Sequence, residues 1–186
     1  MIFVCKGVQV YELFLLGKLL ERPWYGYEFH QVLKAFVGPS RQVSWGTIYP
    51  LFRQLQTQRF VRPISRQTSE GGPDRQTYTI TAAGRRRFHE LMMEERKTNA
   101  DYRETFRAKV GNFSRVDDSI RKSVTRNYLQ RIVAIQAHTT QQYDLVQHVA
   151  SLNEDERIMI LRAIRHERSL VEYEINWLQK EMAEFL

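Results

Sequence analysis

The apolar side chains in the first third of the chain recur at helical spacing and predict short helices. Leucine, valine and aromatic residues set this spacing in residues 10–20 and again in residues 24–36. Pro23 ends the first of these segments, and Gly38-Pro39-Ser40 ends the second. With a third helix in residues 43–55, the short helices and tight turns predict the three-helix core of a helix-turn-helix domain.

Residues 43–55 have the features of a DNA-recognition helix. Ser44 is expected to cap the helix with its hydroxyl group. The first turn, residues 44–47, has no acidic side chain that would repel DNA. Because Pro50 cannot donate a hydrogen bond to Gly46, we expect the helix to bend or to start late. Four apolar residues at i, i+3, i+4 and i+7 would dock the helix on a core: Ile48, Leu51, Phe52 and Leu55.

The segment that follows predicts a β-hairpin. Residues 60–68 have the apolar pattern of a strand, and Pro63 restricts this strand to a sheet edge. Residues 69–74 form a loop by composition, and the alternating residues 75–80 return as the second strand. A hairpin directly after the recognition helix makes the domain winged. Its arms carry basic side chains that suit a phosphate backbone or a minor groove: Arg62, Arg66 and Arg75.

The chain beyond the hairpin is predicted to be helical. Thr81 is expected to cap a helix that ends near residue 96. The Arg85-Arg86-Arg87 triplet near its start fits a solvated face and a DNA contact equally well. Residues 99–112 continue helically, and residues 117–149 form a long helix with an apolar stripe.

The last helix carries an apolar seam, and Ser151 or Asn153 is expected to cap its start. Residues at alternating spacings of three and four form the seam: Leu161, Ile164, Arg168, Val171, Ile175, Leu178, Met182 and Phe185. Such a seam needs a partner helix, either from residues 117–149 of the same chain or from a second chain. We favour a homodimer, in which the apolar seam residues from Leu161 to Met182 pack against a second chain. A helical hairpin within a monomer is the alternative.

These elements predict a mainly α protein with a small β-hairpin and two domains. Residues 1–97 would form a winged helix-turn-helix DNA-binding domain, and residues 98–186 a helical domain for dimerisation and effector response. The formal net charge of +7 supports this division. Residues 1–97 carry 15 Lys/Arg against 8 Asp/Glu, whereas residues 98–186 carry 13 of each. A basic first half favours a reader of nucleic acid, although an acidic membrane surface would also attract it.

Other compositional features narrow the class of protein. The chain has no run of about 18 apolar residues, so we expect no transmembrane helix and no membrane partner. No cleavage site follows the first apolar stretch, as a signal peptide would require. The single cysteine, Cys5, cannot form an intramolecular disulfide, which favours a reduced cytosolic protein over an intermolecular bridge.

Nothing in the sequence favours an enzyme. The G-x-S-x-G, P-loop and H-E-x-x-H motifs are absent. The five histidines are scattered, and a single cysteine argues against a structural zinc site, so we expect neither a metal nor a cofactor. A different class of function stays open: a helical interaction module whose basic half docks on an acidic protein partner.

Four motifs, in this order, resemble the PadR family of bacterial transcriptional regulators. They are Tyr25-Gly26-Tyr27-Glu28, Ser44-Trp45-Gly46-Thr47-Ile48-Tyr49-Pro50, Gly71-Gly72-Pro73-Asp74-Arg75 and Tyr78-Thr79-Ile80-Thr81-Ala82-Ala83-Gly84. The resemblance covers roughly residues 10–92, and Trp45 stands where the family usually has a tyrosine. Later segments such as Phe106-Arg107-Ala108-Lys109 are similar to the longer-armed branch that includes phenolic-acid repressors.

The resemblance implies a homodimeric repressor that binds a palindromic operator in double-stranded DNA. It also implies that a small, often aromatic molecule or another signal releases the DNA. The motif match carries the expected groove contacts onto these residues: Ser44, Trp45, Thr47 and Tyr49. It carries a wing contact onto Arg75. We add Arg41, Arg53 and Gln76, because their charge or hydrogen-bonding capacity lies beside those positions.

The effector site is not identified by the sequence. Several aromatic residues would line a pocket in one interpretation and form ordinary core or dimer packing in another: Trp24, Tyr25, Tyr27, Tyr102, Phe106 and Trp177. We favour packing for each residue taken singly.

Overall fold

The computed structural model describes residues 8–38, 43–67, 75–95 and 101–185. The chain divides into two compact units, residues 1–117 and residues 118–186. The predicted boundary lies after residue 97, so the segment between the two boundaries belongs to the first unit. The roles of the two domains in DNA binding and effector response stay predictions.

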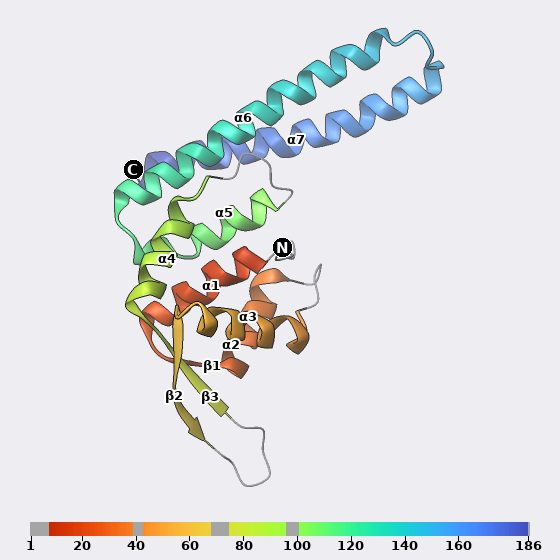
Figure 1. Ribbon diagram of the computed structural model, residues 1–186. Coiled ribbons are helices and arrows are strands. Elements are labelled where there is room, and N and C mark those ends of the chain that lie inside the picture. The colour runs from red at the N-terminus through yellow and green to blue at the C-terminus, as the bar shows by residue number, and fades with distance from the viewer. Residues whose placement is uncertain (1–7, 39–42, 68–74, 96–100, 186) are drawn as a thin grey trace. The chain divides into compact units, whose positions relative to one another are not determined.

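Helices dominate the described part of the chain, and the short strands form a small antiparallel sheet (Figure 1), which confirms the predicted fold class. In chain order the elements are α1 (Val8–Glu21), β1 (Trp24–Tyr25), α2 (Gly26–Val37), α3 (Trp45–Thr57), β2 (Val61–Gln67), β3 (Arg75–Ile80), α4 (Ala82–Met93), α5 (Tyr102–Val110), η1 (Phe113–Arg115), α6 (Asp118–His148) and α7 (Glu154–Phe185). The three-helix core and the wing therefore occur in the predicted order.

Aromatic rings connect the first three helices of the chain, α1, α2 and α3. Phe29 of α2 lies 5.9 Å from Phe14 of α1, measured between ring centroids. It also meets Phe52 of α3 edge-on, at 5.7 Å. Tilted and edge-on pairs are the favoured arrangements of aromatic rings. The leucines around them are completely buried: Leu15, Leu16, Leu33 and Leu55.

The sheet has three antiparallel strands in the order β1-β3-β2. β2 is therefore an edge strand, which confirms the position predicted from Pro63. The pairing register between β2 and β3 shifts between Pro63 and Ser65. Pro63 itself has no backbone N–H to donate to a neighbouring strand. The sequence does not predict β1, because two residues are too few to show a period. Its Trp24 pairs with Tyr78, so β1 ties the start of α2 to the wing.

Thr81 and Gly84 fix the start of α4 against the base of the wing. The Thr81 hydroxyl accepts a hydrogen bond of 3.0 Å from the Gly84 N–H, which confirms the predicted cap. A Cβ atom at Gly84 would lie 2.1 Å from the carbonyl oxygen of Phe60. Glycine is therefore required for α4 to pass this close to the start of β2. The helix ends at Met93 rather than near residue 96.

α5 and η1 dock on α1 and so belong to the first unit. A Cβ atom at Gly17 of α1 would lie 1.9 Å from Oδ1 of Asn112, so the two segments are in close contact. Asn112 is buried, and its Nδ2 donates a hydrogen bond of 2.8 Å to the carbonyl oxygen of Ala108. Arg115 forms an ion pair with Glu21 at the end of α1. These contacts explain why the first unit extends beyond the predicted boundary.

In the second unit, α6 and α7 form an antiparallel hairpin (Figure 1). Asn153 caps the start of α7: its Oδ1 accepts from the Glu156 N–H at 2.9 Å, and the Glu156 carboxylate accepts from the Asn153 N–H at 3.1 Å. This reciprocal capping box selects Asn153 from the two predicted caps. Farther along, the hydroxyl of Tyr128 in α6 donates to the carboxylate of Glu174 in α7.

Part of the predicted seam of α7 is buried within the chain. Val171 and Leu178 are completely buried. The Arg168 guanidinium lies 5.6 Å from the ring centroid of Tyr143 in α6. Four further apolar seam residues are half-buried: Leu161, Ile164, Ile175 and Met182. The side chain of Phe185 lies outside the described part of the chain. Val171 and Leu178 are therefore buried by residues of their own chain. The predicted dimer seam stays a prediction.

Candidate nucleic-acid interface

α3 begins at Trp45, directly after Ser44, so Pro50 does not delay its start. The backbone N–H groups of Thr47 and Ile48 both donate to the carbonyl oxygen of Ser44, at 3.0 and 3.3 Å. Ser44 has the extended backbone of an N-cap residue, but its hydroxyl makes no capping hydrogen bond within the described residues. The predicted hydroxyl cap is therefore wrong. The side chain of Ser44 is exposed instead.

The two sides of α3 differ sharply in burial. All four residues of the predicted apolar stripe are buried, which confirms the docking face. The opposite side is a continuous exposed row at i, i+3, i+4, i+7 and i+8: Gly46, Tyr49, Pro50, Arg53 and Gln54. Trp45 and Thr47 lie half-buried in the first turn. No residue of α3 is acidic, so this row carries no fixed negative charge.

Four rings from α2 and α3 gather at the start of α3, and we call Tyr27, His30, Trp45 and Tyr49 the aromatic cluster. The Trp45 indole stacks on the His30 imidazole, with ring centroids 4.4 Å apart. The rings of Tyr49 and Tyr27 lie 5.4 and 6.1 Å from the indole. A hydrogen bond of 2.8 Å joins His30 Nε2 to the carbonyl oxygen of Val43. Because a carbonyl can only accept, Nε2 carries the hydrogen.

The cluster joins residues that the sequence places apart. Trp45 and Tyr49 are predicted groove contacts, whereas the sequence assigns Tyr27 only to an effector pocket or to packing and gives His30 no role. The spacing of apolar residues cannot reveal this association, because it depends on how α2 crosses α3. The structure thus adds two residues of α2 to the candidate site.

α3 lies in a segment of the chain without acidic residues. Between Glu28 and Glu70 the chain contains six Lys or Arg and no Asp or Glu. The six are Lys34, Arg41, Arg53, Arg59, Arg62 and Arg66. All acidic residues of the first half lie outside this segment. The segment therefore indicates a polyanion-binding surface more strongly than the difference in net charge between the two chain halves does. A surface with basic residues and no carboxylates attracts polyanions.

Tyr78 attaches the wing to α3. Its ring stacks on that of Phe52, with centroids 4.3 Å apart. The pKa of Tyr78 lies above its ordinary value because the phenol is desolvated and Tyr49 lies nearby, although Arg53 acts in the opposite direction. The side chains of Tyr49, Arg53 and Tyr78 therefore lie within electrostatic reach of one another. This places the exposed row of α3 beside the sheet.

The other predicted contacts are described to different extents. Arg41 lies outside the described residues. Arg75 begins β3, but its side chain and that of Arg66 are outside the described part of the chain. Gln76 is half-buried, and its Nε2 donates a hydrogen bond of 3.2 Å to the carbonyl oxygen of the next residue. Arg62 of β2 is exposed, as a contact to a phosphate backbone would require.

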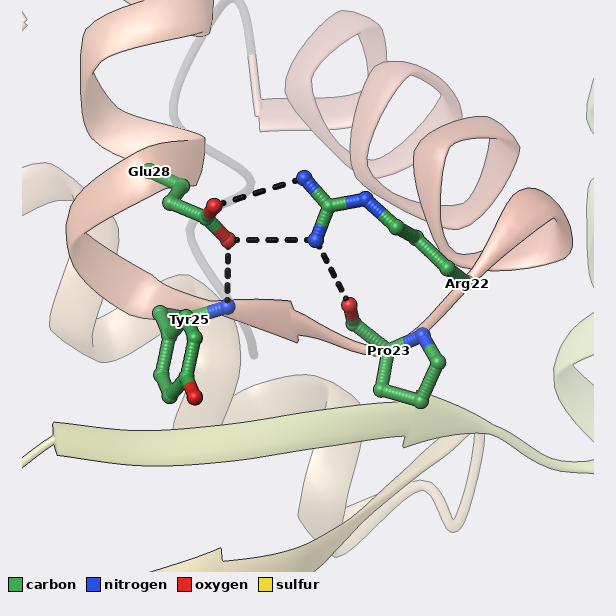
Figure 2. A network of polar contacts seen from close by, with 4 residues as sticks. All are labelled: Arg22, Pro23, Tyr25 and Glu28. Atoms are coloured by element: carbon green, nitrogen blue, oxygen red, sulfur yellow. Dashed lines mark hydrogen bonds and ion pairs between the residues drawn. The ribbon is translucent and has the colours of Figure 1, made fainter. Parts of the chain in front are cut away.

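Arg22 and Glu28 fix the turn that leads from α1 into α2 (Figure 2). Two guanidinium nitrogens of Arg22 each lie 3.3 Å from a carboxylate oxygen of Glu28, which also accepts from the backbone N–H of Tyr25 at 3.2 Å. Burial acts to raise the pKa of Glu28. The hydrogen bonds from Arg22 and Tyr25 and the charge of Arg22 outweigh it, so this pKa lies below its ordinary value. The network orients the first turn of α2, which carries Tyr27.

The arginine triplet of α4 divides into two roles. Arg87 pairs with Glu12 of α1, with Nε 2.9 Å from Oε1, and the Glu12 side chain is only 5% exposed. Burial acts to lower the pKa of Arg87, but its carboxylate neighbours, Glu12 foremost and Glu90 with it, raise this pKa overall. Arg85 and Arg86 are exposed. Arg87 therefore joins α4 to α1. The two predicted roles, a solvated face or a DNA contact, apply only to Arg85 and Arg86.

The candidate site consists of aromatic, hydroxyl and basic side chains. Among the described residues, no three or more His, Cys, Asp or Glu side chains are grouped so that they would hold a metal ion. Within the same residues, no helix has the length and apolar character needed to cross a membrane.

Comparisons with known proteins place the N-terminal half of the chain in a family. The family model for the transcriptional regulator PadR-like family matches residues 15–90. A Lysinibacillus sphaericus protein called "Uncharacterized protein X" is 31% identical over 80 residues, which are 43% of this chain and 72% of that protein. The matched residues 15–90 include α3, the wing and all four motifs that resemble the family.

Solved structures are similar to the chain as well. The crystal structure of a Streptococcus transcriptional regulator is 32% identical, with a TM-score of 0.36, over 44% of this chain and 76% of that chain. Bacillus subtilis PadR in complex with operator DNA is 15% identical, with a TM-score of 0.42, over 93% of this chain and 96% of that chain. Members of the PadR-like family are transcriptional regulators and not enzymes. The chain belongs to the PadR-like family of transcriptional regulators.

Proposed function

We propose that this chain is a homodimeric, sequence-specific DNA-binding repressor that a small molecule releases from its operator. The observation that carries the DNA-binding part is the exposed row of α3, which has no acidic residue and adjoins the aromatic cluster. A helix of this kind fits the major groove, where side chains reach base edges and phosphates. Such a repressor acts on the chromosome, in the cytoplasm.

In this proposal the first turns of α3 supply the base contacts. Trp45 and Tyr49 offer ring surface, and the exposed Ser44 offers a hydroxyl group. Thr47 adds a second hydroxyl from a half-buried position. Arg53, one turn beyond Tyr49 on the exposed row, would pair with a phosphate or a guanine.

The wing supplies contacts to the DNA backbone in the same proposal. Arg62 is exposed on β2, the edge strand, and Arg75 begins the neighbouring strand. Arg41 precedes α3 in the chain, and Gln76 follows Arg75. Contacts of this kind set the register of a protein on the duplex without reading its sequence.

We place the dimer surface on a second face of α7. Six exposed residues recur at alternating spacings of four and three: Met159, Ala163, His166, Leu170, Tyr173 and Trp177. A row with this period, apolar except at His166, is typical of helices that pair. This row differs from the predicted seam, whose fully buried members pack within the chain. Two copies joined in this way would present two recognition helices to half-sites about 34–36 Å apart.

Effector release stays a proposal without an assigned pocket. Trp24 and Phe106 are buried, which supports packing rather than ligand contact for these two. Tyr27 belongs to the aromatic cluster beside the recognition helix. Tyr25, Tyr102 and Trp177 are the remaining aromatic candidates. Release would follow if the effector rotates the two recognition helices away from their half-site spacing.

Fluorescence anisotropy tests the proposed function. A labelled duplex from directly upstream of this protein's own gene is titrated at two salt concentrations, with a scrambled duplex of equal composition as control. We expect preference for the upstream duplex, two chains bound per duplex, and affinity that falls steeply as salt rises.

Two results would contradict the proposal in different ways. Salt-sensitive binding without preference for any duplex, including those selected from a random pool, would exclude sequence-specific regulation. Absence of binding to all duplexes at low salt would favour an acidic protein as the partner of the basic half.

A further inference from the structure

We propose that the aromatic cluster reads the 5-methyl group of a thymine in the operator, with Tyr27 and His30 as positioning residues for Trp45. This inference rests on the proposed DNA-binding function and deepens it. It names the base feature that the start of α3 recognises, and it assigns a role to two residues of α2.

The geometry of the cluster restricts the Trp45 side chain. Three rings lie 4.4 to 6.1 Å from the indole, and each is inclined to it by no more than 32°. Two of these neighbours are themselves held in place. His30 Nε2 donates a hydrogen bond of 2.8 Å to the carbonyl oxygen of Val43. The Tyr27 hydroxyl accepts a hydrogen bond of 2.8 Å from Nε2 of Gln31. The indole is therefore positioned before any DNA binds.

The chemistry of the cluster favours a methyl group over a polar base edge. Specific pairing with guanine or adenine uses side chains such as Arg, Lys, Asn or Gln, which form two parallel hydrogen bonds. The four cluster residues have no such group. They offer carbon surface, and in the major groove the feature that carbon surface recognises is the thymine methyl group.

The position of the cluster fits this role. Trp45 is the first residue of α3, in the part of a recognition helix that contacts base edges in helix-turn-helix proteins. Tyr27 and Tyr49 are each 59% exposed, so the cluster is open to solvent on the side of the exposed row. The Tyr27 and Tyr49 hydroxyl groups can donate to a phosphate, but such a contact carries no sequence information, so the loss of a thymine methyl group distinguishes base reading from phosphate contact.

The test replaces each thymine of a bound duplex by deoxyuridine, which lacks only the 5-methyl group. The probe is a duplex selected by this protein from a random pool, remade with one substitution at a time. We expect one thymine in each half-site at which deoxyuridine weakens binding about fourfold. This corresponds to the ~0.8 kcal/mol of one buried CH₂ group.

Variants assign the effect to the cluster. Trp45→Ala and His30→Ala should abolish the difference between thymine and deoxyuridine, while both still bind scrambled DNA in a salt-dependent way. His30→Phe keeps a ring beside Trp45 and should retain the difference. Lys34→Ala, on the exposed side of α2, should weaken binding to both duplexes equally and serves as the matched control.

The outcomes separate this inference from the function on which it rests. If no duplex is preferred over scrambled DNA, the proposed function fails. If a duplex is selected but deoxyuridine has no effect at any thymine, only the methyl-reading proposal is overturned. It is also overturned if Trp45→Ala retains the full difference. Equal loss in His30→Ala and His30→Phe would remove His30 as a positioning residue.

Discussion

Two ion pairs in the first unit have the same chemistry but differ in burial. Glu12 and Arg87 expose 5% and 23% of their side chains, whereas Glu28 and Arg22 expose 37% and 51%. Water solvates an exposed ion when its partner is removed, but it does not reach a buried one. The two pairs therefore have different consequences for stability, although each joins neighbouring segments of the same unit.

Arg87→Ala should lower the free energy of unfolding by about 3–5 kcal/mol, because it leaves the carboxylate of Glu12 buried and unpaired. Urea denaturation followed by circular dichroism measures the change. Arg86→Ala removes a neighbouring exposed arginine and should change stability by no more than about 0.5 kcal/mol. Similar values for the two variants would show that the ion pair does not hold α4 to α1.

Glu28→Gln should lower stability by about 0.5–1 kcal/mol at neutral pH, a small value because the pair is exposed. The pKa of Glu28 is lower in the folded state than in the unfolded chain, where it is about 4.3. Its contribution is therefore complete above the unfolded value and disappears as the pH falls through the folded one. Urea titrations from pH 7 to pH 3 should show the two proteins converging. A difference that persists at pH 3 would contradict this cause.

At the scale of helices and strands, the close approach of α4 to the wing makes a sharp prediction. Helix propensity alone would make Gly84→Ala stabilising by about 1 kcal/mol. The Cβ atom would meet the Phe60 carbonyl oxygen, so we expect destabilisation of about 1–3 kcal/mol instead. Thermal unfolding determines the sign. In Gly26→Ala the nearest atom to the new Cβ, on Phe52, is 3.9 Å away, so this control should be nearly neutral.

The elements with a long or well-marked pattern are the ones that the sequence predicts. The apolar stripe of α3, the edge position of Pro63 and the Thr81 cap all depend on residues close together in the chain. β1 is too short to show a pattern. The docking of η1 on Gly17 depends on contact between segments that are far apart in sequence. The predicted boundary after residue 97 coincides with a change in net charge along the chain. Net charge carries no information on the contact between these two segments.

The candidate site divides in the same way. Trp45 and Tyr49 follow from a motif within one helix, whereas His30 enters the site only because α2 packs beside α3. Arg87 lies in a triplet whose other two members are exposed. Only the fold shows that Arg87 itself pairs with a buried residue, Glu12. A residue's local sequence therefore predicts a helix face, but the partner of that face depends on tertiary packing.

At the scale of the whole molecule, the dimer proposal depends on the exposed row of α7. Leu170→Glu should shift a dimer toward folded monomers, because a charge in an apolar helix interface is strongly unfavourable. Sedimentation velocity over a range of concentrations measures the change. Gln179→Glu adds the same charge at an exposed position outside this row and should leave the oligomeric state unchanged. A dimer that tolerates Leu170→Glu would place the interface elsewhere.

In the proposed function, the exposed side of α3 and its aromatic cluster read DNA. The most direct test compares the wild type with a triple variant, Trp45→Ala, Tyr49→Ala and Arg53→Ala, by anisotropy at physiological salt. The probes are a duplex selected by the wild type and its scrambled control. We predict that the wild type prefers the selected duplex by about 10³-fold or more, and that the triple variant binds both duplexes equally through its remaining basic residues. A triple variant that keeps the preference would show that another surface reads the sequence.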